Sequence, residues 1–111
     1  MSRSVREQMQ VDLVAALKAG DVAAVSVLRT TLAAVANAEA VDPGAGALLV
    51  RAGLFGDVER RTLGADDVQA IVAAERAELV AAARTLDESG RTVEAGACRI
   101  RAAILERYVA A

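Results

Sequence analysis

The chain has 111 residues, a net charge of −2 and a pI near 5.1, and 55% of its residues are hydrophobic although only 2% are aromatic. This length fits one domain with its own core, built from Ala, Val, Leu and Ile. A weak negative charge gives no general attraction to nucleic acid or to acidic lipid. The sequence has no His and one cysteine, Cys98, which excludes an internal disulfide and a thiolate metal cluster and leaves an inert thiol as the expected role of Cys98.

The first third of the chain predicts a helical hairpin. Residues 4–19 place apolar side chains at helical spacing, with Ser4 as N-cap and Gly20 as the left-handed stop. Asp21 then caps a second helix over residues 22–41. The Gly-Asp junction is short, so we expect these two helices to lie antiparallel.

The run DPGAG at residues 42–46 ends the second helix, because Pro43 disfavours helix in the residue before it. The apolar segment 46–56 is read as a short extra helix that packs back on the bundle. Further helices are predicted over residues 65–88, up to the stop at Gly90, and over residues 92–109. The fold class is therefore all-α, a bundle of four main helices in a single domain covering residues 1–111.

Charged residues on apolar stripes are the candidates for function. Glu39 and Glu75 lie centrally on such stripes, where an ionised carboxylate needs a partner. Arg29 lies about 15 Å along the helix from Glu39, too far for a pair within the helix, so each needs a partner on another helix or another chain. Glu75 is the natural candidate for Arg29. We weigh three readings of these residues, namely ion pairs that fix helix register, a groove for a charged partner, and a catalytic carboxylate pair as the least favoured.

Two further patterns leave alternatives open. Ser26, Thr30, Ala33 and Asn37 form a small, polar flank that suits either close helix packing or a surface groove. Arginines around the last helix give a mild basic excess, which suits a solvated face or contact with nucleic acid, although aromatic residues that stack on bases are scarce. These arginines are Arg91, Arg99, Arg101 and Arg107.

The order of several motifs resembles the GatB/YqeY family. LKAGDVAAVSVLRTTLAAVANAEAV at residues 17–41 resembles its N-terminal hairpin, with Leu-Arg ending at Arg29 and Asn-Ala-Glu at residues 37–39. LGADDVQAIVAAE at residues 63–75 resembles the next family segment, VERRTL at residues 58–63 resembles the run before it, and Gly90-Arg91 and ILERY at residues 104–108 fall at matching spacing. The resemblance covers nearly the whole chain.

The resemblance implies an all-α domain of unestablished activity, linked to the tRNA-dependent amidotransferase, a carbon–nitrogen ligase that uses glutamine as amido donor. It is similar to the helical region near the tail of the B subunit, which contacts tRNA, whereas the catalytic centres of that enzyme lie elsewhere. The expected role is a non-catalytic binding or adaptor module without cofactor or metal. The residues expected to bind are Arg29, Asn37, Glu39, Glu75 and Arg91.

Two departures from the family pattern shape the expected partners. Family members continue past the Tyr with a second small domain, whereas this chain ends soon after Tyr108, so we expect that domain to be absent. Basic residues that the family carries in the third helix are here Leu79 and Val80, which favours an apolar surface and a homodimer through it. The partner is therefore expected to be tRNA or, alternatively, a protein. Without a signal peptide or membrane span, we expect a soluble cytoplasmic protein.

Overall fold

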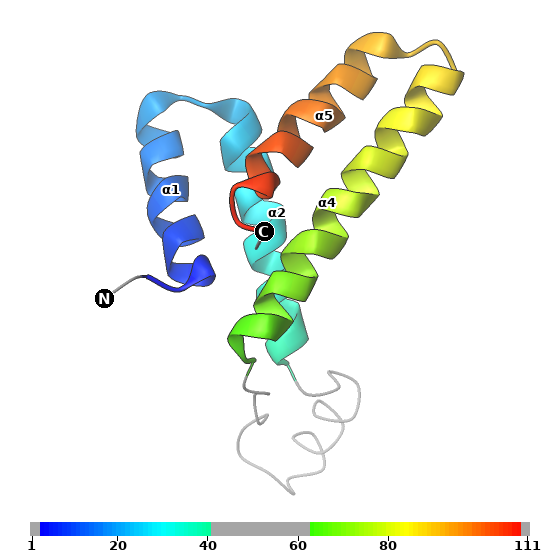
Figure 1. Ribbon diagram of the computed structural model, residues 1–111. Coiled ribbons are helices and arrows are strands. Elements are labelled where there is room, and N and C mark those ends of the chain that lie inside the picture. Colours follow the sequence, from blue (N-terminus) through cyan, green and yellow to red (C-terminus); the bar gives the residue numbers. More distant parts are fainter. Residues whose placement is uncertain (1–2, 41–62, 110–111) are drawn as a thin grey trace, which may run out of the picture.

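The computed structural model describes residues 3–40 and 63–109, which form four helices: α1 (Val5–Ala19), α2 (Val22–Glu39), α4 (Ala65–Glu88) and α5 (Thr92–Glu106). The all-α prediction is confirmed, and the helix boundaries differ from the predicted ones only at the C-terminal ends of α2 and α5. The predicted extra helix over residues 46–56 lies outside the described residues. Figure 1 shows two helical hairpins that diverge from a shared base, in a molecule measuring 52 × 40 × 28 Å.

The ends of the helices follow from local side-chain chemistry. The Ser4 hydroxyl accepts a hydrogen bond from the Glu7 amide at 3.1 Å, and the Asp21 carboxylate accepts one from the Ala24 amide at 3.1 Å. At the start of α4, the Gly64 amide donates to the Asp67 carboxylate at 3.0 Å. Each of these bonds satisfies a backbone donor that the helix start leaves without a partner.

Two glycines close the two hairpins. Gly20 and Gly90 have φ values of 70° and 77°, in the left-handed region that side chains with a Cβ rarely adopt. The next amide in each case, that of Asp21 and of Arg91, bonds back to the carbonyl five residues earlier, that of Ala16 and of Leu86, at 3.0 and 2.8 Å. Both turns are therefore tight, and each pair of helices runs antiparallel, as the Gly-Asp junction predicted for the first.

The core lies where α2 meets the other three helices. Each helix contributes a fully buried side chain to this core: Met9 from α1, Val35 from α2, Val72 from α4 and Leu105 from α5. Thr31 is also fully buried, and its hydroxyl donates to the Val27 carbonyl at 2.8 Å, which removes the cost of burying it. The core cluster reaches Ala16 and Ala24 beside the turn of the first hairpin. The turn end of the second hairpin projects beyond α1 and α2 (Figure 1).

Candidate functional site

The five residues predicted to bind a partner do not form one cluster. Arg29 and Asn37 are exposed on α2, Glu39 ends that helix, Glu75 lies in the middle of α4, and Arg91 precedes α5. Within the described residues, no hydrogen bond or ion pair joins any two of them. The five residues therefore divide into two groups. Glu39 and Glu75 are half-buried against other helices, whereas Arg29, Asn37 and Arg91 face solvent.

Glu39 belongs to the first group. Its Oε1 lies 2.5 Å from Nη2 of Arg6, and its side chain is only 17% exposed. The sequence predicted that Glu39 needs a partner on another helix, and that is confirmed by Arg6 on α1. The hydrogen bond from Arg6 to Glu39 raises the pKa of Arg6. The pair ties the start of α1 to the end of α2, opposite the turn at Gly20.

The pair proposed between Arg29 and Glu75 is not formed. Arg29 is exposed beside the first turns of α2, whereas Glu75 is half-buried on α4. Burial raises the pKa of Glu75, and the nearby Glu78 carboxylate raises it further. Glu75 therefore keeps an electrostatic cost that Arg29 was expected to remove.

The basic excess around α5 is partly neutralised. Arg91 pairs with Glu94 within the first turn, and Arg99 pairs with Asp87 across the hairpin. Arg101 and Arg107 make no ion pair with any described residue, and Arg101 is half-buried. Of these four arginines, only Arg101 and Arg107 therefore keep a charge without a carboxylate partner among the described residues.

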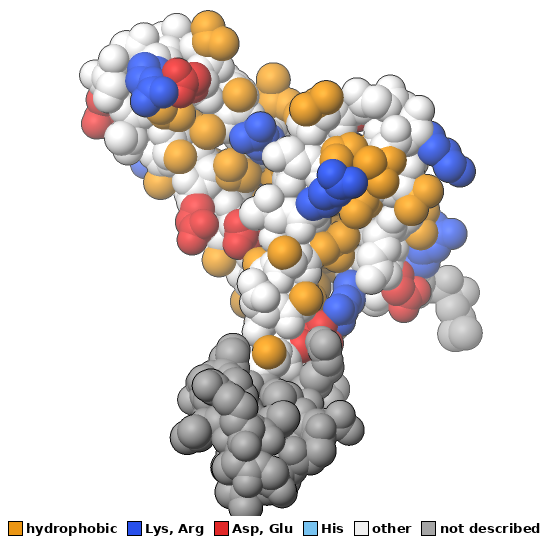
Figure 2. All heavy atoms as spheres, turned by 180° about the vertical axis from the view of Figure 1, so that it is seen from behind, with side chains coloured by type: hydrophobic (Ala, Val, Ile, Leu, Met, Phe, Trp, Pro, Cys, Tyr) orange, Lys and Arg blue, Asp and Glu red, His pale blue; other side chains and the backbone are white. Residues whose placement is uncertain are grey.

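The small, polar flank of α2 lies at the surface. Thr30, Ala33 and Asn37 are exposed and Ser26 is half-buried, so the expectation of close helix packing over this flank is wrong. The alternative, a surface groove for a partner, stays a prediction. At its N-terminal end the flank continues into a groove of about 440 Å³ between α1 and α2. Figure 2 shows hydrophobic side chains gathered around a basic one on this hairpin. We call this surface the outer groove, and its lining residues are Leu17, Gly20, Val22, Val25, Ser26 and Arg29.

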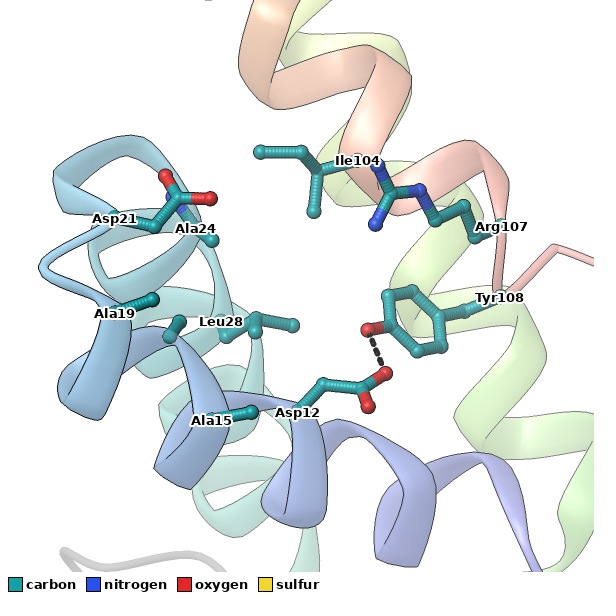
Figure 3. Close-up of a pocket in the computed structure, with 10 residues that line it drawn as sticks. Asp12, Ala15, Ala19, Asp21, Ala24, Leu28, Ile104, Arg107 and Tyr108 are labelled. Carbon is teal, nitrogen blue, oxygen red and sulfur yellow. Dashed lines mark hydrogen bonds between the residues drawn. The ribbon is translucent and has the colours of Figure 1, made fainter.

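A second cleft separates the two hairpins on their inner side (Figure 3). It has a volume of about 260 Å³. Four alanines, Leu28 and two aspartates, Asp12 and Asp21, line it on one side and face Ile104 and Arg107. At its edge the Tyr108 hydroxyl donates to Asp12 Oδ2 at 2.5 Å, and Gln8 donates to Asp12 Oδ1 at 2.9 Å. Burial is the main cause that raises the pKa of the Tyr108 hydroxyl, and the hydrogen bond to Asp12 raises it further. Sequence reasoning did not single out Asp12, because no local pattern links two residues that lie 96 positions apart.

Leu79 and Val80, the residues predicted to form an apolar surface, are both half-buried. Leu79 packs against the core, so the predicted patch around them is not the most exposed apolar surface. Large hydrophobic side chains with more than a third of their surface exposed occur on α1, on the first turn of α2 and on α5. They are Val11, Val14, Leu17, Val22, Val93 and Ile100.

The described residues contain no group of three or more acidic or Cys side chains arranged to hold a metal ion. Among the same residues, no helix is both long enough and apolar enough to cross a bilayer. Cys98 carries a half-buried free thiol on α5.

Comparison of the chain with protein-family models, with curated proteins and with solved structures found no match.

Proposed function

We propose that this protein is a non-catalytic binding module of the GatB/YqeY type, and that it binds a protein partner through the outer groove and the exposed flank of α2. The observation that carries the proposal is the position of Arg29 and Asn37. Both belong to the motifs behind the family resemblance, and both lie exposed on the face that continues from the groove. Binding, rather than packing within the domain, accounts for polar and apolar residues arranged together there.

The shape and chemistry of this face suit an amphipathic helix. Ser26, Thr30 and Ala33 are small, so a partner backbone can approach closely. Val22 is 78% exposed and Leu17 is 48% exposed, which gives apolar area to bury at one end. Arg29 lies between these two parts and favours a carboxylate on the partner. By resemblance, the expected partner belongs to the tRNA-dependent amidotransferase machinery.

The proposal can be tested with purified tRNA-dependent amidotransferase from the same organism, in a titration that follows binding by calorimetry. Ala33→Trp fills the flank, and we expect it to weaken binding by at least about tenfold, as for a central interface position. Ala70→Trp, at an exposed position of α4, is the matched control and should leave binding unchanged. Binding that both variants leave intact, or no binding at all, contradicts the proposal.

Association with tRNA is the second candidate, supported by Arg101 and Arg107. These guanidinium groups have no carboxylate partner among the described residues, and Arg107 borders the inner cleft. A gel-shift titration with bulk tRNA at two salt concentrations tests it, because phosphate contacts weaken strongly as salt rises. A salt-sensitive shift that Arg107→Glu removes supports RNA binding, and no shift at low salt excludes it.

A further inference from the structure

One face of α5 carries large apolar side chains that are exposed near the turn at Gly90 and buried near the other end of the helix. Ile104 is 8% exposed and Ala95 and Ala102 are buried, whereas Val93 is 86% exposed and Ile100 is 58% exposed. Val93, Ala97, Ile100, Ile104 and Tyr108 recur at helical spacing on one face, but the first three are exposed and only the last two are buried. The half of α5 next to the turn extends beyond α1 and α2 (Figure 1), so only its side toward α4, which carries Ala95, is covered there.

We propose that the exposed stripe of α5 is a homodimer interface, in which α5 packs antiparallel against α5 of a second copy with Ala97 near the two-fold axis. The two-fold symmetry requires that every contact occurs twice, with the roles of the two copies exchanged. Val93 and Ile100 satisfy this requirement. They lie seven residues apart, about two helical turns, and therefore on the same side of the helix. In this arrangement Val93 of each copy packs on Ile100 of the other.

The centre of the stripe allows close approach of the two helices. Gly96 and Ala97 lie midway between the two large side chains, and an added Cβ at Gly96 would meet nothing within 4 Å. Small residues at a helix crossing bring the helix axes to the short end of the usual separation. The larger side chains on either side then interlock across the axis.

Charge supports a second copy as the occupant. Glu94 and Arg101 also lie seven residues apart, on one flank of the stripe, so the same symmetry places Glu94 of each copy opposite Arg101 of the other. Arg101 is half-buried, and its Nε has no hydrogen-bond partner among the described residues. Glu94 already accepts from Arg91, and a carboxylate retains further acceptor positions. A second copy of the chain carries the matching surface, because its own α5 presents the same apolar stripe with the same acidic and basic residues on its flank.

The interface is small, since each copy offers one face of a 15-residue helix. An area of this kind lies at the low end for specific complexes, so we expect a reversible dimer at micromolar concentrations. The surface is separate from the outer groove and from the flank of α2. The inference is therefore independent of the proposed function, and variants of α5 should leave partner binding through α2 unchanged.

Sedimentation velocity over a dilution series, from hundreds of micromolar to below one micromolar, tests the dimer. We expect Ile100→Asp to raise the dissociation constant at least about tenfold, because it places a charge in the apolar contact. Val11→Asp adds the same charge to an apolar position of α1 that is 42% exposed, and should leave the constant unchanged. Circular dichroism establishes that both variants are folded. A chain that stays monomeric at the highest concentration, or a dimer that Ile100→Asp leaves intact, overturns the proposal.

A charge exchange tests the antiparallel register. Glu94→Arg and Arg101→Glu should each weaken the dimer, because each places like charges opposite each other, and the double variant should restore it. An Ala97→Cys variant with Cys98→Ser should form a disulfide-linked dimer on mild oxidation, since the two Cα atoms approach each other at the axis. A double variant as weak as the single ones, or an Ala97→Cys chain that does not cross-link, overturns this register.

Discussion

Tyr108 is the only tyrosine in a chain without tryptophan, and its hydroxyl joins the last residues of the fold to Asp12 on the first helix. The contact lies at the edge of the inner cleft and is partly buried. Hydrogen bonds to a charged acceptor in such places contribute more than neutral ones do. A single phenol therefore makes a measurable contribution to the docking of α1.

We predict that Tyr108→Phe lowers the free energy of unfolding by about 1–2 kcal/mol at neutral pH. The pKa of Tyr108 is raised in the folded chain, so this stabilisation is complete below the ordinary tyrosine pKa of about 10 and is lost as the pH rises above it. Near-ultraviolet absorbance of the phenolate reports the titration of this one side chain, in the native chain and in urea. Equal midpoints in the two conditions would contradict the prediction.

The two half-buried glutamates should respond in opposite ways to the same substitution. Glu39→Gln weakens the ion pair with Arg6, and we expect a loss of about 1–2 kcal/mol in the free energy of unfolding. Glu75→Gln removes a charge that burial and Glu78 disfavour, and we expect a gain of roughly 0.5 kcal/mol at neutral pH. Because the pKa of Glu75 is raised, this gain should disappear below about pH 4, where the carboxyl is protonated in both states.

Urea denaturation at the two pH values measures both effects. The control is Glu7→Gln on the exposed first turn of α1, for which little change is expected. The same sign for Glu39→Gln and Glu75→Gln would show that their environments do not differ as the structure indicates.

The outcome for these residues shows where sequence reasoning stops. A carboxylate on an apolar stripe predicts that Glu39 has a partner, since burying an unpaired charge is costly. The identity of the partner depends on which helix ends meet in space, and Arg6 lies one full hairpin earlier in the chain. Arg29 was assigned to Glu75 on charge alone, and α2 instead turns it toward solvent.

The helices and their turns are the part of the fold that local sequence determines most completely. The structure confirms the helix starts predicted from Ser4 and Asp21 and the turns predicted from Gly20 and Gly90. These features are predictable because a cap or a left-handed turn depends on only a few neighbouring residues. The exposure of half of α5 was not predictable in this way. Its apolar spacing continues from Val93 to Ile104, and only the tertiary arrangement decides how far α1 and α2 reach along it.

A matched pair of glycine substitutions tests the turn between α4 and α5. We expect Gly90→Ala to destabilise the fold by about 1 kcal/mol, because its φ of 77° strains a residue with a Cβ. Gly96→Ala should stabilise it by a similar amount, since Ala is the better helix former and its Cβ meets open space. Thermal unfolding at low protein concentration measures both, and changes of the same sign would contradict the assignment.

At the scale of the whole molecule, stability is distributed unevenly between the base that the two hairpins share and the turn end of the second hairpin. The Leu105 side chain is fully buried in the core, whereas the Ile100 side chain, on the same helix, is 58% exposed. We expect Leu105→Ala to cost about 2–5 kcal/mol and Ile100→Ala to cost about 0.5 kcal/mol or less. Denaturant titration of the two variants measures the difference, and similar costs would mean that the core extends further along the hairpin.

Amide hydrogen exchange should show the same gradient along single helices. The core ends of α4 and α5 pack against α2, and we expect their amides to exchange only through global unfolding. The amides near Gly90 are stabilised by the hairpin alone and should exchange through local opening. Uniform protection along both helices would contradict this picture.

The bond between Asp12 and Tyr108 also sets an order of assembly on the ribosome. The hairpin of α1 and α2 has its turn at Gly20 and its closing ion pair at Glu39, so all of its internal contacts are available early in synthesis. Tyr108, whose phenol bonds to Asp12, follows Asp12 by 96 residues in the chain. The hairpin of α1 and α2 can therefore form first, whereas the bond that joins Asp12 to the end of the second hairpin can form only after Tyr108 has been synthesised.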